Sequence, residues 1–156
     1  MNILVLGGTG FIGTNLLLRL KNNNTYKIYS TYYLSKPRIH NKNIKNLKAN
    51  LTSKRSVLKV FKKDYFDVVV MCAAVSTGAK DIKNNPLIHL NDNIIMNLNT
   101  LEYAKIFKVK KFIFISSNTV YPLTKYPVKE TDAKFDFYKS YYVVGWMKRF
   151  TEIVCD

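Results

Sequence analysis

The stretch MNILVLGGTGFIGT, residues 1–14, decides the fold of this chain. Residues 2–6 form a nearly continuous apolar run, which is typical of a strand buried on both faces of a parallel sheet. Three glycines follow at a regular spacing, Gly7, Gly10 and Gly13, and residues 11–20 continue as an apolar helical stretch. Strand, glycine turn and helix in this order predict the phosphate-binding corner of a dinucleotide fold.

Each of the three glycines meets a separate physical need. Gly7 permits a tight turn, and Gly13 lets the helix pack closely against the strand. Gly10 lets a pyrophosphate approach the helix N-terminus, where the backbone N–H groups, with Phe11 and Ile12 in the first turn, favour an anion. The spacing is not the G-x-G-x-x-G of many dehydrogenases, so a tight turn without a ligand is the alternative interpretation.

Length and composition predict one ordered globular domain. The chain has 156 residues, of which 47% are hydrophobic. No apolar run reaches the roughly 18 to 20 residues of a membrane span, and residues 1–6 are too short for a signal peptide. Cys72 and Cys155 have neither CxxC spacing nor a nearby pair of histidines, so we expect reduced thiols, a cytoplasmic location and no metal site.

The positive charge requires an explanation. Lysine and arginine total 25 against 10 acidic residues, a formal charge of +15, which attracts polyanions. The lysines are scattered singly among asparagines, and the sequence contains neither a clean basic helix stripe nor a zinc-finger or RNP-like pattern. The pattern therefore favours an anionic cofactor or a nucleotide-sugar as the partner over a specific nucleic acid.

The end of the second expected strand, residues 26–31, bears on the choice of cofactor. An acidic residue there favours NAD, whereas a basic residue accommodates the 2′-phosphate of NADP. The strand ends at Thr31, and no Asp or Glu precedes Lys36 and Arg38. This favours NADP over NAD, with solvated loop charges as the equal alternative for the two cations.

Several segments together resemble the extended short-chain dehydrogenase/reductases. GGTGFIG at residues 7–13 resembles the nucleotide-binding turn of that family. After a strand over residues 44–49, Asn50-Leu51 resembles the Asp-Leu pair near the adenine, and Thr52 or Ser53 can cap a helix over residues 54–62. The apolar strand DVVVMCAA, residues 67–74, is similar to D-V-V-x-H-x-A-A. It places Ala73, Ala74 and Val75 where a cofactor lies beyond the strand end.

Two further segments resemble parts of the family's catalytic site. A long helix from Pro86 to about Phe107 is similar to the N-x-x-x-T-x-N-L-L-E-A-A helix, which by resemblance gives Asn93 the task of positioning a water and the active-site lysine. An ordinary surface amide is the alternative for Asn93. A strand over residues 111–116 ends in SSNTVYP, which resembles S-S-x-x-I-Y-P; Ser117 is then the catalytic hydroxyl and Ser116 lies against the cofactor.

The family's acid/base tyrosine is missing from its usual position. Lys148-Arg149-x-x-Glu152 resembles the K-x-x-x-E helix, so Lys148 corresponds to the lysine that binds the nicotinamide ribose and lowers the pKa of the tyrosine. Four residues earlier stands Val144. Tyr142 is the candidate replacement, although on an ideal helix it lies on a different face from Lys148. Tyr141 would share the face of Lys148 but lie about 10 Å away along the axis. A helix that begins later, at Gly145, would leave both tyrosines on a segment that can bend back.

The resemblance implies a Rossmann-type, doubly wound α/β domain over residues 1–156, with helices on both faces of a parallel sheet in the order 3-2-1-4-5. It also implies the nucleotide-binding half of a nucleotide-sugar epimerase, dehydratase or reductase, most similar to GDP-fucose synthases. In the complete enzyme, hydride would be transferred at a sugar carbon, and long helices would pair in a homodimer. We expect the substrate domain to be absent from this chain. A non-catalytic NAD(P)-binding module or degenerate fragment is the alternative, favoured by Val144.

Overall fold

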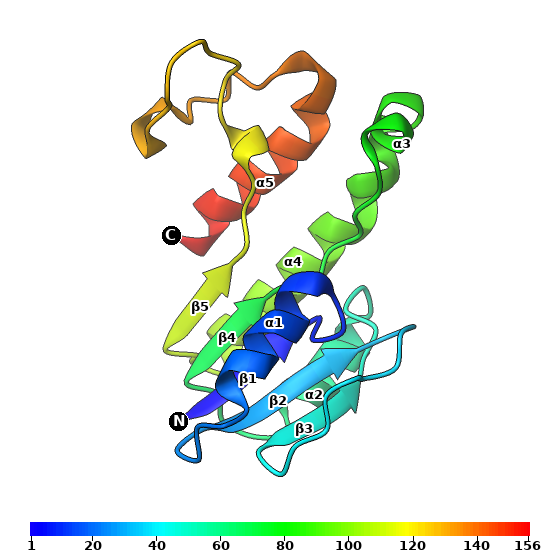
Figure 1. Ribbon diagram of the computed structural model, residues 1–156, viewed down its shortest axis with the longest axis vertical. Helices are drawn as coiled ribbons and strands as arrows, with labels where there is room; N and C mark the ends of the chain where they lie inside the picture. The colour runs from blue at the N-terminus through cyan, green and yellow to red at the C-terminus, as the bar shows by residue number, and fades with distance from the viewer. The chain divides into compact units, whose positions relative to one another are not determined.

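Five parallel strands form a single sheet in the computed structural model, which describes residues 1–78, 80–81, 84–85 and 87–156 (Figure 1). The strand bounds are β1 (Asn2–Leu6), β2 (Lys27–Tyr32), β3 (Ile44–Lys48), β4 (Val68–Met71) and β5 (Lys111–Phe114). Their spatial order is β3-β2-β1-β4-β5, which confirms the predicted doubly wound topology. The strands are shorter than predicted at several ends, and Ala73 and Ala74 lie just beyond β4 rather than within it.

The helices agree less well with the prediction at the start of the long helix, which begins later than expected. The longer helices are α1 (Phe11–Leu20), α2 (Lys54–Phe61), α4 (Asn91–Ile106) and α5 (Tyr142–Cys155). The shorter ones are α3 (Ala79–Asn84), η1 (Pro86–His89), η2 (Asn118–Val120), η3 (Glu130–Asp132) and η4 (Lys139–Tyr141). The helix predicted from Pro86 is therefore divided, and α4 begins only at Asn91; Pro86 itself, like Ala79, lies outside the described residues.

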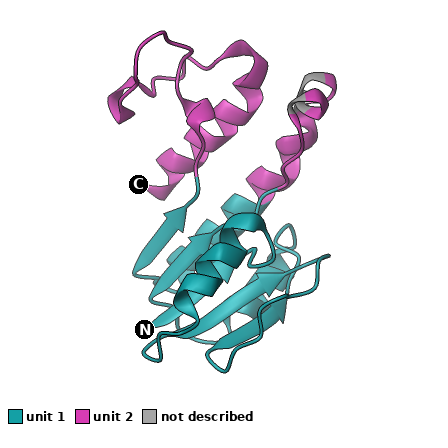
Figure 2. Cartoon of the chain, viewed as in Figure 1, with its two compact units in different colours: residues 1–74, 96–115 teal, residues 75–95, 116–156 magenta. Residues whose placement is uncertain are grey.

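The chain divides into two compact units, shown in different colours in Figure 2. Unit 1 contains residues 1–74 and 96–115, with the whole sheet, and unit 2 contains residues 75–95 and 116–156. Each unit is described separately below. The interpretation of residues 1–156 as one domain stays a prediction.

In unit 1, α1 covers one face of the sheet while α2 and the unit's part of α4 lie on the other (Figure 1). Side chains alternate along a strand, so Ile3 and Val5 of β1 point to the α1 face, where they form a buried cluster with Leu17 and Ile28. Burial on both faces explains why β1 reads as a continuous apolar run.

A chain of aromatic rings joins the sheet to the two helices on the opposite face. Tyr29 of β2 contacts Phe66 with ring centroids 5.2 Å apart, and Phe66 contacts Phe61 of α2 at 6.0 Å. Phe61 in turn contacts Tyr103 of α4 at 6.2 Å. Edge-to-face and tilted ring pairs of this kind add to the stabilisation from buried area, so this row fixes how α2 and α4 lie on the sheet.

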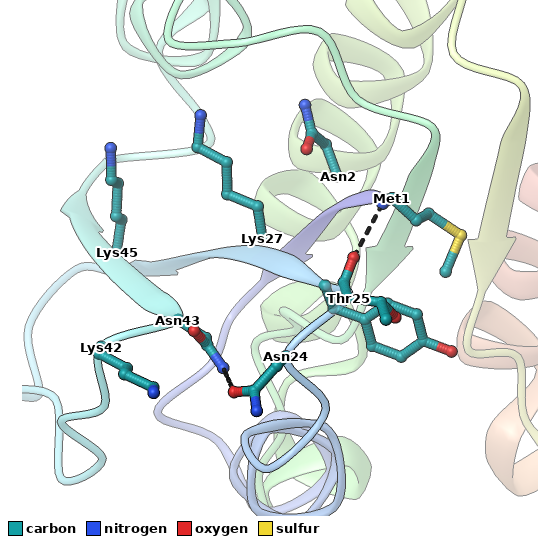
Figure 3. A pocket seen from close by; sticks show the side chains of 9 residues that line it. Met1, Asn2, Asn24, Thr25, Lys27, Lys42, Asn43 and Lys45 are labelled. Carbon is teal, nitrogen blue, oxygen red and sulfur yellow. Dashed lines mark hydrogen bonds between the residues drawn. The ribbon is translucent and has the colours of Figure 1, made fainter.

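The amino ends of the strands carry a small basic cavity of about 330 Å³ (Figure 3). Lys27 and Lys45 extend in the same direction from β2 and β3, whereas Lys42 extends elsewhere. The ammonium of Lys27 pairs with Asp64 at 2.5 Å. The three cations thus do not converge, and the cavity lies at the sheet edge opposite to the one where parallel α/β sheets bind ligands.

The carboxylate of Asp64 stabilises the fold in a pH-dependent way. Hydrogen bonds from Lys27 and from the Tyr29 hydroxyl, at 2.7 Å, lower the pKa of Asp64 from 3.8 to about 2. A lowered pKa in the folded state means that the stabilisation is complete above the unfolded value and is lost as the pH falls towards 2. We expect Asp64→Asn to lower the free energy of unfolding by about 1 kcal/mol at pH 7. This difference should vanish near pH 2 in urea titrations.

Asp136→Asn is the matched control, because Asp136 is exposed. It should unfold like the parent chain at every pH. An Asp64→Asn deficit that persists unchanged at pH 2 would show that the carboxylate charge is not its cause.

None of the described helices is long and apolar enough to cross a membrane.

Cys72 and Cys155 are both free thiols, and burial raises the pKa of Cys72 to about 11. The Cys72 thiol is therefore protonated and unreactive at neutral pH. A cytoplasmic location stays a prediction.

Candidate functional site

The glycine turn after β1 is held by the end of β2. Gly7 has a φ of 85°, a conformation that favours glycine, and its N–H donates to the Thr31 hydroxyl at 2.9 Å. The N–H of Gly8 donates to the Thr31 carbonyl at 2.8 Å. A Cβ on Gly7 would lie 2.6 Å from the backbone N and Cα of Ala73, so the segment after β4 packs directly against the turn.

Gly8 and Gly13 are required by packing within the protein. A Cβ on Gly13 would collide with the Gly7 carbonyl oxygen, and one on Gly8 would collide with the Ser30 hydroxyl and lie 2.9 Å from Leu17. The requirement at Gly13 agrees with the predicted close approach of helix and strand. The requirement at Gly8 was missed, because it comes from a β2 side chain that the local sequence does not indicate.

Gly10 differs from these glycines because the protein does not require it. It is the N-cap of α1, with φ −75° and ψ 171°, a conformation open to any residue. A Cβ there would meet only the Gly7 carbonyl oxygen, at 3.5 Å, an ordinary contact. Glycine at this position therefore leaves open a space that a side chain could occupy without harm to the fold.

The open space at Gly10 lies at the exposed N-terminus of α1. No side chain among the described residues caps this helix, and no acidic residue stands in its first turn. Phe11 is 87% exposed and Ile12 is 45% exposed. The first N–H groups of a helix lack partners within it and carry the positive end of its dipole, so this corner suits an anion such as a phosphate.

Other predicted cofactor residues of unit 1 form hydrogen bonds at or just after the ends of β2 and β3. Thr31 is buried behind it, with its hydroxyl accepting from Gly7. The Asn50 side chain accepts from the N–H and hydroxyl of Thr52, at 3.0 and 2.8 Å, and the Leu51 carbonyl accepts from Asn99 at 3.0 Å. Direct contacts of Thr31, Asn50 and Leu51 with a cofactor stay predictions.

The two predicted NADP-selecting cations lie in the segment after β2. Lys36 and Arg38 are both exposed, between the end of β2 and the start of β3. Ser53, rather than Thr52, is the N-cap of α2 and accepts from the N–H of Ser56 at 3.3 Å.

In unit 2, Asn93 fixes the segment that follows β4. Its side-chain oxygen accepts from the N–H of Val75 at 2.8 Å, and its amide donates to the carbonyls of Val75 at 2.9 Å and His89 at 2.6 Å. Asn93 is only 3% exposed, so it is not a surface amide. In this structure it orders the backbone at Val75, and its role in positioning a water and the lysine stays a prediction.

The hydroxyl of Ser117 is part of a small local network. It accepts from the N–H of Thr119 at 3.2 Å and from the Thr119 hydroxyl at 3.0 Å, and Ser117 is the N-cap of η2. The neighbouring Ser116 instead donates to the carboxylate of Glu152, which pairs with Arg149 at 2.9 Å. Ser116 thus links the segment after β5 to α5, and its contact with a cofactor stays a prediction.

Helix α5 packs closely on η2. A Cβ on Gly145 would collide with the Thr119 carbonyl oxygen and lie 3.0 Å from Phe137. Lys148, three residues further along, is half-buried, and this burial lowers the pKa of its ammonium. The predicted role of Lys148, binding the nicotinamide ribose and lowering the pKa of a tyrosine through its positive charge, stays a prediction.

The two tyrosines at the start of α5 are placed differently. Tyr142 is the first residue of α5, so the alternative in which this helix begins at Gly145 is wrong. Its ring is 53% exposed and packs edge-on against Phe137 with centroids 5.6 Å apart. Tyr141, the N-cap, is half-buried and lines a cavity of unit 2.

That cavity has a volume of about 500 Å³ and is lined by hydroxyl- and amide-bearing residues together with the apolar Pro122 and Leu123. Its hydroxyl- and amide-bearing residues are Thr77, Asn118, Thr119, Tyr121, Tyr138 and Tyr141. None of the described residues that line it carries a formal charge. Thr119 was not singled out from the sequence, although SSNTVYP contains it. Tyr141 and Tyr142 were both considered from the sequence, and the surroundings of the two side chains differ only in the three-dimensional structure.

Comparison with known proteins gives one family. The NAD dependent epimerase/dehydratase family matches residues 3–155 of this chain. The UDP-glucose 4-epimerase of Caenorhabditis elegans is 29% identical over 147 residues, which cover 83% of this chain and 42% of that protein.

Solved structures agree with this match. The Thermotoga maritima UDP-glucose 4-epimerase with UDP-glucose is 28% identical, with a TM-score of 0.80 over 98% of this chain and 49% of that one. The Bifidobacterium longum enzyme in complex with NAD⁺ and UDP is 27% identical, with a TM-score of 0.76 over 99% and 48%. The chain spans less than half the length of these relatives. Its likeness to GDP-fucose synthases stays a prediction.

Proposed function

Because this chain belongs to the NAD dependent epimerase/dehydratase family, we propose that it binds a nicotinamide dinucleotide and is the nucleotide-binding part of an enzyme acting on nucleotide-sugars. The observation that carries the proposal is Gly10: the fold accepts a side chain there, yet the position is left open at the N-terminus of α1. The pyrophosphate is the group whose approach explains the missing side chain.

In this proposal the residues of the two units have different roles. In unit 1 the turn from Gly7 to Gly13 receives the pyrophosphate, and Ala73 and Ala74 leave room beside it. In unit 2 Ser117 orients the substrate hydroxyl and Lys148 holds the nicotinamide ribose. The bound cofactor supplies hydride acceptance and return at a sugar carbon. A homodimer through the long helices is part of the same proposal.

NADP is the proposed form of the cofactor, because β2 ends without a carboxylate and Lys36 and Arg38 follow it on the surface. Fluorescence titration with NADPH and NADH tests this choice. We expect both to bind, and we expect Lys36→Ala/Arg38→Ala to weaken NADPH about tenfold while leaving NADH unchanged, because only NADPH carries the 2′-phosphate.

Lys62→Ala/Lys63→Ala is the charge-matched control, since both lysines are exposed. It should bind NADPH like the parent chain. Equal losses of NADPH affinity in the two double variants would show that the change in net charge alone causes the effect. Failure of both dinucleotides to bind would contradict the proposed function.

A non-catalytic NAD(P)-binding module is the second candidate, and Val144 is the observation that favours it. Conversion of UDP-glucose to an epimerised or dehydrated product in the presence of NAD⁺ or NADP⁺ separates the candidates, because the hydride taken from the sugar is returned in each turnover. Tight cofactor binding with no product, even in Val144→Tyr, supports the module; product formation by the parent chain supports the enzyme.

A further inference from the structure

Two adjacent phenols with different surroundings, Tyr141 and Tyr142, stand at the start of α5. Tyr142 directs its ring against Phe137 and is largely exposed. Tyr141 lines the 500 Å³ cavity of unit 2 together with Thr119. Two neighbouring residues of the same chemistry thus have different surroundings, which makes them a natural pair for comparison.

The cavity adjoins the predicted catalytic hydroxyl through Thr119. The Thr119 hydroxyl donates to Ser117 at 3.0 Å, and Thr119 itself lines the cavity. Gly145 seats α5 on the Thr119 carbonyl, so the start of the helix is fixed relative to this network. A molecule in the cavity would therefore contact groups that belong to one rigidly packed local structure.

The chemistry of the cavity wall selects a class of ligand. Hydroxyl and amide groups both donate and accept hydrogen bonds, which matches the ring hydroxyls of a sugar. None of the described lining residues carries the positive charge that would favour a phosphate in the cavity. The volume lies within the usual range of small-molecule sites.

Tyr141, the last residue of η4 and the N-cap of α5, precedes the predicted active-site lysine Lys148 by seven residues. On an ideal helix this spacing is about two turns, which would place the two residues nearly in line and about 10 Å apart along the axis. Tyr142 is turned by about 100° from that line.

We propose that Tyr141, and not Tyr142, hydrogen-bonds the sugar of the nucleotide-sugar inside the cavity lined by Thr119. This inference rests on the proposed function and goes beyond it by naming the phenol that recognises the substrate where position 144 carries valine. Tyr141 then determines affinity for the sugar, while the nucleotide and the dinucleotide cofactor bind elsewhere.

Calorimetric titration with UDP-glucose and with UDP, each in the presence of NADH, tests the inference. We expect Tyr141→Phe to weaken UDP-glucose about tenfold, as for one lost hydrogen bond, and to leave UDP and NADH unchanged. Tyr142→Phe, the matched control, should leave all three unchanged. The difference between UDP-glucose and UDP isolates the sugar contact from any general disturbance of the fold.

Four results would overturn the inference. These are unchanged UDP-glucose affinity in Tyr141→Phe, equal losses for UDP and UDP-glucose, a selective loss in Tyr142→Phe instead, and no binding of UDP-glucose by the parent chain. The NADH titration reports on the proposed function separately, because a chain that binds NADH but not UDP-glucose keeps its cofactor site while the inference fails.

Discussion

Gly10→Ala is expected to weaken NADH binding by about 10- to 100-fold and to change the thermal unfolding midpoint by no more than about 2 °C. The methyl group fits the folded protein, because its nearest neighbour is a carbonyl oxygen at 3.5 Å. It occupies the space through which a phosphate reaches the first N–H groups of α1, and one lost hydrogen bond to a charged group is worth about 1.5–3 kcal/mol. Fluorescence titration and thermal unfolding of the same preparation measure both quantities.

Gly78→Ala is the matched control for this substitution. Gly78 is also a helix N-cap, with φ −72° and ψ 165°, and no atom lies within 4 Å of a Cβ built there. Gly78→Ala should change the thermal unfolding midpoint as little as Gly10→Ala does, and it should leave the NADH affinity unaltered. NADH binding that survives in Gly10→Ala would remove the observation on which the proposed function rests.

Gly7→Ala is expected to act on the fold itself, lowering the free energy of unfolding by about 3 kcal/mol. The backbone at Gly7 has a φ of 85°, which costs a residue with a side chain about 1 kcal/mol or more. The added Cβ would also lie 2.6 Å from the backbone of Ala73, and overpacking of this kind costs about 1–3 kcal/mol. The midpoint of thermal unfolding should fall by about 6–12 °C.

Gly7→Ala and Gly10→Ala therefore separate the two reasons for which a phosphate-binding turn contains glycine. Their stabilities should differ by several degrees although they lie three residues apart. Equal stabilities of Gly7→Ala and Gly10→Ala would show that the segment at Ala73 moves aside easily, and that its packing against the glycine turn does not stabilise the fold.

The parts of the fold that could be predicted are those with a clear local pattern in the sequence, such as an apolar run or a glycine turn. Apolar runs marked β1, β4 and β5, and the glycine turn after β1 marked the start of the first helix. The ends of the strands were less predictable, because the hydrogen bonding of a strand stops where its neighbouring strands end. β4 ends at Met71, which pairs with Leu6 and Phe114, the last residues of its neighbours, although the apolar sequence continues to Ala74.

The candidate site was predictable as a set of backbone features and less so as a set of side chains. The positions of Gly7 and Gly13 follow from local geometry, which a sequence motif encodes. The different surroundings of Tyr141 and Tyr142 depend on the packing of Phe137 and on Thr119, which is 22 residues before Tyr141. The hydrogen bonds of Asn93 to the backbone of Val75, 18 residues earlier, could not be predicted from the sequence, and its expected role in positioning a water and the lysine stays a prediction.

The two hydrogen bonds from Gly7 and Gly8 to Thr31 have a kinetic consequence. They fasten the turn to β2 before any ligand arrives, so its N–H groups need little reordering to receive a phosphate. Preorganisation of this kind removes an entropic cost of association and the delay of a loop that must close. NADH should therefore associate in a single fast phase whose observed rate rises linearly with concentration, and Thr31→Val, which loosens the turn, should slow that phase.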